Sequence, residues 1–112
     1  MTFSTRNDKD VVIVETTFQR LDASLAPALR AALLAPVDAG ATSLVLDLSG
    51  VSFVDSSALG ALIAAAKRLA AHRGFAVAGV QPAVARLFAL THMERVFSIH
   101  PDTGEAIARL ST

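Results

Sequence analysis

Cysteine, tryptophan and tyrosine are all absent from this chain of 112 residues. Without cysteine there is no disulfide scaffold, no thiolate nucleophile and no Cys-ligated zinc. Without tryptophan or tyrosine the best platforms for base stacking are missing. Ten acidic residues also balance ten basic ones, so no excess of positive charge is left to attract a phosphate backbone. We therefore expect no nucleic-acid partner.

Long apolar segments are absent as well. No uninterrupted apolar run approaches the roughly 20 residues that a membrane-spanning helix needs. The first ten residues, MTFSTRNDKD, lack the apolar centre of a signal peptide. We therefore expect no signal peptide, no direct insertion into a membrane and a cytoplasmic location.

The sequence motifs of common enzymes are missing too. There is no P-loop, no dinucleotide-binding glycine pattern and no G-x-S-x-G elbow. His72, His92 and His100 are widely spaced and share no pattern of metal ligands. We therefore predict no cofactor, no metal site and no enzymatic activity.

Apolar residues make up 53% of the chain, which is enough for one compact core. With six phenylalanines as the aromatic residues, this core must be mostly aliphatic. No linker, repeat or low-complexity tract interrupts the chain. We interpret residues 1–112 as a single domain.

Runs of β-branched and apolar residues alternate with helical periodicity. Strands are predicted at 11–15, 43–48, 75–80 and 96–99, with an edge strand at 2–6 and a polar turn at 7–10 before them. Helices are predicted to begin near 22–24, with Asp22 or Ser24 as the N-cap, at Asp55, at Pro82 and at Asp102; Pro36 with Gly40 and then Gly74 should end the first two. This order predicts an α/β fold, with a mostly parallel central sheet of four to five strands and about four helices.

The most unusual segment is DLSGVSFVDSSALG, residues 47–60. It leads from a strand through a turn into a helix, and Asp55, Ser56 and Ser57 lie where that helix begins. Backbone N–H groups at a helix start have no helical partner and favour negative charge, so a phosphate on a serine would meet donors there. Taken alone, however, the triplet is more typical of a helix cap than of any function.

The longer pattern DLSGVSFVDSSALGALIAAAKRL resembles the signature of the STAS domain, in the form found in bacterial anti-sigma factor antagonists. Three further segments are similar to that family in the expected order: RLDA at 20–23, GVQPAVARLF at 79–88 and VFSIHP at 96–101. The likeness covers nearly the whole chain and implies a STAS-like fold.

The resemblance implies a phosphorylation switch. The residue matching the family's acceptor is Ser56, with Ser57 as the second candidate. The unphosphorylated form would bind an anti-sigma factor that is also a serine kinase and so free the sigma factor. Phosphorylation would end the binding, and a PP2C-type phosphatase would reset the switch. Asp22, Asp55, Ser57 and Ala58 would share the partner-binding surface with Ser56.

Two positions depart from the family pattern. Ala58 and Gln19 stand where the family usually has glycine. The methyl group of Ala58 could change how closely a kinase approaches, whereas Gly60 would serve the packing or turn of the motif. A different function stays open for such a chain: a STAS subunit of a stress-signalling scaffold, or of a lipid or anion transporter complex. Met93 and Phe97 are assigned to the core.

Overall fold

A five-stranded sheet forms the centre of the molecule, seen here in a computed structural model that describes residues 3–111. Its strands run in the order β1 (Phe3–Asp8), β2 (Val11–Thr16), β4 (Ser43–Asp47), β6 (Gly74–Ala78) and β7 (Ser98–His100). Strand β1 is antiparallel to β2, and every later pair is parallel. The predicted mostly parallel sheet is thereby confirmed.

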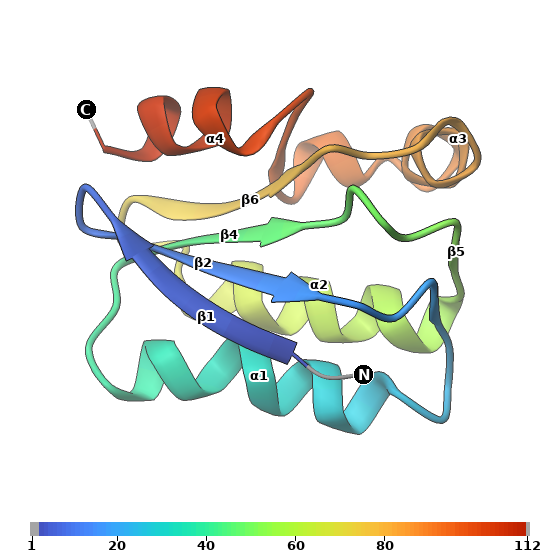
Figure 1. Cartoon of the computed structure of the whole chain (residues 1–112), viewed down its shortest axis with the longest axis horizontal. Helices are drawn as coiled ribbons and strands as arrows, with labels where there is room; N and C mark the ends of the chain where they lie inside the picture. Colours follow the sequence, from blue (N-terminus) through green and yellow to red (C-terminus); the bar gives the residue numbers. More distant parts are fainter. Residues whose placement is uncertain (1–2, 112) are drawn as a thin grey trace.

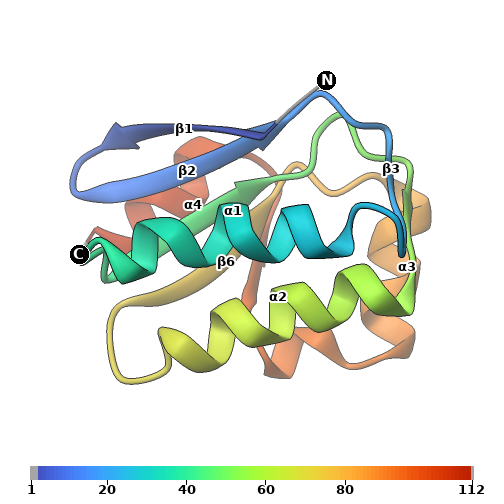
Figure 2. The ribbon, with the colours of Figure 1, turned by 90° about the horizontal axis from the view of Figure 1, so that it is seen from below.

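Four α-helices accompany the sheet: α1 (Ala26–Asp38), α2 (Ser56–Arg68), α3 (Pro82–Leu90) and α4 (Thr103–Leu110). Helices α1 and α2 lie on one face and α4 lies on the other (Figure 1). Figure 2 shows α1 and α2 side by side across the sheet. Helix α3 packs on the short strand β5 (Phe53–Val54) and on a 3₁₀ turn, η1 (Met93–Arg95).

The alternation of side chains along the strands builds a core on each face of the sheet. Toward α1 and α2 the buried strand residues are large: Val14, Leu44, Leu46, Phe75 and Val77. Toward α4 they include two alanines: Val11, Ile13, Val45, Ala76 and Ala78. Met93 and Phe97 are buried in the larger core, as expected, and the Phe97 ring lies edge-on to those of Phe75 and Phe88.

The amino-terminal hairpin is longer than predicted. Thr2 lies outside the described residues, but the strand continues through Asn7 and Asp8, which were assigned to a turn. The turn is only Lys9-Asp10, and both residues have a positive φ, of 50° and 68°. Such a two-residue turn matches the twist of paired strands. The polar strand β1 therefore stays paired with β2 as far as Asp8.

The first helix also differs from the prediction at its start and near its end. Helix α1 begins at Ala26, after a turn in which the Asp22 carbonyl accepts from the N–H groups of Leu25 and Ala26. Pro36 lies inside α1, two residues before its end, although proline there removes a hydrogen bond and crowds the carbonyl of Ala32. The helix ends in a Schellman motif at Gly40, whose φ is 109°.

Three boundaries nearer the carboxyl terminus are shifted. Helix α2 ends at Arg68, and Gly74 is already the first residue of β6. Strand β6 ends at Ala78, two residues before the predicted end. Strand β7 covers Ser98–His100 in place of 96–99, because Val96 and Phe97 donate their N–H groups to the Met93 carbonyl of η1. Within residues 3–111 no helix is long and apolar enough to cross a bilayer.

Candidate functional site

Asp55 begins helix α2 as its N-cap. Its backbone is extended, with φ −104° and ψ −177°, and its carboxylate accepts the N–H of Ala58 at 3.0 Å. A cap of this kind stabilises a helix by about 1 kcal/mol. Ser56 and Ser57 are thereby fixed as the first two residues of the helix, and both side chains are exposed.

A second, two-stranded parallel sheet connects this helix start to the start of α1. Strand β3 (Arg20–Leu21) pairs with β5. Beyond that pairing, the Asp55 N–H donates to the Leu21 carbonyl at 3.2 Å, and the Ser52 N–H donates to the Gln19 carbonyl at 2.8 Å. Two of the segments that resemble the family, 20–23 and 47–60, are therefore joined at the main chain, and Asp22 directly follows the strand whose Leu21 carbonyl accepts the Asp55 N–H.

The carboxylate of Asp22 is held by Ser24. It accepts the Ser24 hydroxyl at 2.6 Å and the Ser24 N–H at 3.1 Å. The hydroxyl hydrogen bond is the largest influence that holds the pKa of Asp22 below its usual value. Asp22 is therefore ionised at neutral pH, and it adds a fixed negative charge to this end of the molecule.

Arg20 and Phe53 form a contact that the sequence did not reveal. They lie opposite each other in the β3–β5 pair, and the Arg20 guanidinium carbon lies 4.0 Å from the centre of the Phe53 ring. Phe53 is one of the few large apolar side chains left exposed, at 37%. Only the pairing of two very short strands creates this contact, so no local pattern could have predicted it.

Ser56 and Ser57 differ in their surroundings. Ser57 borders a cavity of about 420 Å³ between α1 and α2, which Arg30 and Gly60 also line. Ser56 borders none of the larger cavities of the described chain. Within residues 3–111, no hydrogen bond occupies the backbone N–H of either serine. Both free donors therefore remain for an anion at the helix start.

Two neighbours on α2 depart from the prediction. Ala58 is fully buried, so its side chain packs into the core and contributes nothing to the exposed surface. Gly60 is exposed, and a Cβ built on it would meet no atom within 4 Å. The prediction that Gly60 serves packing or a turn is therefore wrong, since it lies within a helix beside open space.

The loop before β5 is fixed by contacts with the loop after β6. The Gln81 side-chain amide donates to the Ser49 carbonyl at 2.8 Å. Gly79 has a φ of 71°, and a Cβ on it would lie 2.9 Å from the Ser49 Cβ. Only glycine fits this close approach, which holds the loop leading to Ser56 against the rest of the sheet.

Carboxylates gather at this end of the molecule. Asp47 ends β4, Asp55 begins α2 and Asp102 begins α4. Asp47 and Asp102 line one small cavity of about 240 Å³. Since parallel strands end at the same edge, these acidic groups lie at the end of the molecule where α2 begins with Ser56.

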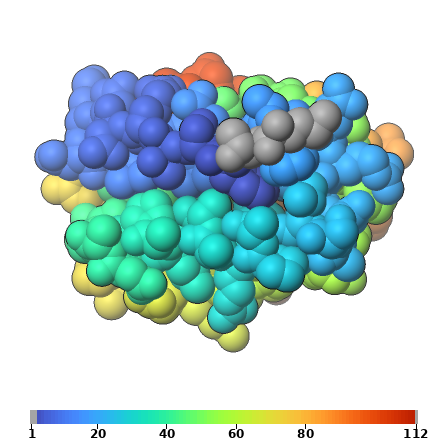
Figure 3. All heavy atoms as spheres, turned by 60° about the horizontal axis from the view of Figure 1, so that its bottom comes forward, coloured from blue at the N-terminus to red at the C-terminus, as the bar shows by residue number. Residues whose placement is uncertain are grey.

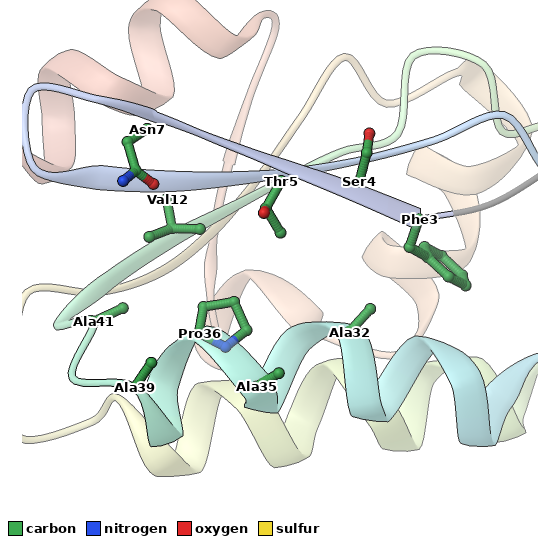
Figure 4. Close-up of a pocket in the computed structure, with 10 residues that line it drawn as sticks. All are labelled: Phe3, Ser4, Thr5, Asn7, Val12, Ala32, Ala35, Pro36, Ala39 and Ala41. Atoms are coloured by element: carbon green, nitrogen blue, oxygen red, sulfur yellow. The ribbon is translucent and has the colours of Figure 1, made fainter.

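A separate groove lies between β1 and α1, as Figure 3 shows from that side. Its volume is about 740 Å³. Figure 4 shows small side chains of α1, among them Ala32, Ala35 and Pro36, directed toward the strand. No residue of 47–60 lines this groove, so it is separate from the site around Ser56.

Residues 2–106 match the family model of the STAS domain. An anti-sigma factor antagonist from Mycobacterium paratuberculosis is 31% identical over 99% of this chain and 94% of its own, with a TM-score of 0.90. A Thermotoga maritima protein described as an anti-sigma factor antagonist is 25% identical over 98% and 95%, with a TM-score of 0.87. SpoIIAA, a Bacillus anti-sigma factor antagonist, shares the fold. Its unphosphorylated form is 23% identical over 97% of this chain and 96% of its own, with a TM-score of 0.79. Its phosphorylated form is 22% identical over 97% of this chain and 99% of its own, with a TM-score of 0.71.

The fold also occurs in proteins with other roles. The murine anion transporter Slc26a9 matches 94% of this chain with 18% of its own length, at 19% identity and a TM-score of 0.73. A stressosome protein matches 96% of this chain and 95% of its own, at 19% identity and a TM-score of 0.68.

Proposed function

The chain belongs to the STAS domain family, and on this premise we propose that it is an anti-sigma factor antagonist controlled by phosphorylation of Ser56. It acts as a single STAS domain over residues 1–112, without enzymatic activity. Its unphosphorylated form binds an anti-sigma factor with serine kinase activity and frees the sigma factor. Phosphorylation ends this binding, and a PP2C-type phosphatase restores it.

The observation that carries the proposal is the position of Ser56. It is an exposed first residue of α2, held by the Asp55 cap and the β3–β5 pair, beside unoccupied backbone donors. A kinase can reach this hydroxyl without opening the fold. A phosphate there meets the favourable end of the helix dipole, so the domain stays folded after modification.

The charge around Ser56 explains why the partner would leave. Phosphorylation adds about −1.5 to −2 charges at neutral pH. Asp22 and Asp55 already place carboxylates at this end, and Arg20, the basic residue of the β3–β5 pair, lies over Phe53. A partner packed on this surface would have to desolvate the phosphate dianion, which is costly unless the partner supplies a positive charge.

The surface that the partner covers consists of Asp22, Asp55, Ser56 and Ser57. To these we add the exposed ring of Phe53 with the Arg20 guanidinium above it. An aromatic ring and an arginine are frequent anchors at protein interfaces. Ala58 is buried and packs α2 against the core.

The test is purification of the tagged chain from its native host, followed by intact mass spectrometry and mapping of any phosphoryl group. Four forms are compared: the unchanged chain, Ser56→Ala, Ser56→Asp and, as the matched control, Ser57→Ala. We expect a phosphoryl group in the unchanged chain and in Ser57→Ala, and none in Ser56→Ala. The kinase should co-purify with Ser56→Ala and not with Ser56→Asp.

Phosphorylation confined to Ser57, or equal retention of the kinase by Ser56→Ala and Ser56→Asp, would contradict the proposal. The other roles of the family remain as the alternative function. Co-purification with a non-kinase assembly or a permease, without any phosphoryl group under several growth conditions, would favour a subunit of a stress-signalling scaffold or of a lipid or anion transporter complex.

A further inference from the structure

A cavity lined by basic residues lies at the end of the sheet opposite Ser56. Its volume is about 430 Å³. The titratable side chains that line it are His72, Arg73, Glu94, Arg95 and Arg109. Arginine thus outnumbers acid three to one in this lining, although the whole chain has no net charge.

The topology brings these arginines together from separate parts of the chain. Arg73 precedes β6, and its N–H donates to the Thr42 carbonyl at 3.1 Å. Arg95 ends the turn η1 that leads into β7, and Arg109 lies in the last turn of α4. Because parallel strands begin at one edge and α4 ends there, the three side chains border a single cavity.

Two arginines of this cluster, Arg73 and Arg95, have no acidic partner within residues 3–111. Glu94, the one acidic residue of the lining, has its carboxylate 3.5 Å from Nδ1 of His92, which does not line the cavity. Over residues 3–111, neither Arg73 nor Arg95 has a carboxylate within salt-bridge distance. The partial negative charge at the end of a helix, about half an elementary charge, is smaller than the full positive charge of either Arg73 or Arg95.

The floor of the cavity is apolar. Leu69, Phe75, Phe97 and Leu110 line it and are almost fully buried. A cleft with walls of one charge and a low-dielectric floor concentrates the electric field on an ion inside it. Guanidinium groups also match the oxygen geometry of phosphate, which they can bind with two hydrogen bonds.

We propose that this cavity binds a small phosphorylated molecule with two or more negative charges. Its volume lies within the usual range of small-molecule sites. The site is independent of the switch proposed for Ser56, because α2, from Ser56 to Arg68, separates the two by about 18 Å. A failure of either proposal therefore leaves the other standing.

The test is a titration of the isotope-labelled full chain with pyrophosphate at constant ionic strength, followed by amide NMR. We expect saturable shifts at residues 72–75 and 94–98 and none at 55–58. Arg73→Ala and Arg95→Ala should each weaken binding about tenfold, since each removes charge-assisted hydrogen bonds. Both side chains are exposed, so the fold should tolerate the changes.

Arg86→Ala is the matched control, because Arg86 is an exposed arginine on α3 that lines none of the cavities named above. It should bind pyrophosphate as the unchanged chain does. Absence of saturable shifts would overturn the proposal, and so would equal weakening by Arg86→Ala. A parallel titration with citrate should give weaker binding; equal affinity would overturn the assignment to phosphate.

Discussion

The carboxylate of Asp22 shows how one local hydrogen bond sets a charge beside the proposed switch. The Ser24 hydroxyl holds the pKa of Asp22 below its usual value. Because the pKa is lowered in the folded state, ionised Asp22 favours folding above its unfolded pKa of about 3.9. This contribution is lost as the pH falls through the folded pKa.

Ser24→Ala should therefore raise the pKa of Asp22 toward that of an unfolded chain. The measurement is a carboxyl NMR titration of the unchanged chain and the variant. Ser111→Ala, which alters a serine far from Asp22 in sequence and at the end of α4, is a suitable control. Equal midpoints for Asp22 in the unchanged chain and Ser24→Ala would show that the hydroxyl does not set the charge.

Among the glycines of residues 3–111, Gly79 leaves the least room for an added Cβ. Gly79→Ala would place a Cβ 2.9 Å from the Ser49 Cβ at a φ of 71°. We expect a loss of about 1–3 kcal/mol in the free energy of unfolding, because a left-handed backbone and a close contact act together. Urea denaturation measures it, and unchanged stability would mean that the Ser49 loop moves freely.

Single residues were predictable where the signal is local. The caps at Asp55 and Asp102 were confirmed, because an acidic side chain before an apolar helical pattern is sufficient to place them. The burial of Ala58 and the Arg20–Phe53 contact were not predictable, since each depends on where distant segments meet. Asp22 did not cap α1 directly, because the preceding turn moves the helix start to Ala26.

Helix α2 contains a glycine that its own stability does not require. Gly60→Ala meets no atom within 4 Å, so it should raise the free energy of unfolding by about 0.5–1 kcal/mol. Gly40→Ala is the matched contrast, because it also has open space but a φ of 109°, and it should destabilise the chain. The comparison is made by urea denaturation.

If the partner covers the α1–α2 surface beside Ser57, Gly60→Ala should weaken binding of the kinase while it stabilises the free chain. Co-purification from the native host measures the first effect. A gain in stability with unchanged partner binding would limit the interface to the loops before α2. A loss of stability would mean that the helix bends at Gly60.

The elements themselves were largely predictable because each has its own periodicity or capping signal. All four α-helices and the mostly parallel sheet were confirmed. The small β3–β5 sheet was missed, since two-residue strands carry no periodicity. The ends of helices differed from the prediction where proline or glycine was expected to end them. Pro36 lies inside α1, and Gly74 is the first residue of β6.

Over the whole molecule, two charged groups lie at opposite ends of the sheet. Asp47 and Asp55 lie at the end that carries Ser56, whereas Arg73, Arg95 and Arg109 line a cavity at the other end. Phosphorylation of Ser56 should therefore add negative charge to the end that already carries Asp47 and Asp55. It should change the free energy of unfolding by no more than about 1 kcal/mol, because the helix dipole and the nearby carboxylates act in opposite directions.

The check is urea unfolding and an amide NMR spectrum for each form of the chain. Shifts should be confined to residues 20–22 and 52–58, with the two sheet cores unchanged. Ser57→Ala, phosphorylated in the same way, serves as the control for modification at a single site. Global unfolding on phosphorylation would contradict a switch that acts at the interface.

The sheet order β1-β2-β4-β6-β7 is also the order of these strands along the chain. No strand therefore has to be inserted between two others, whether the chain folds during or after its synthesis. Assembly can proceed as a row that grows from one side, with β7 and α4 added last. Helix α4 packs mainly on β4, β6 and β7, and it completes a core that also contains Val11 and Ile13 of the hairpin, so this final unit joins the first strands to the last.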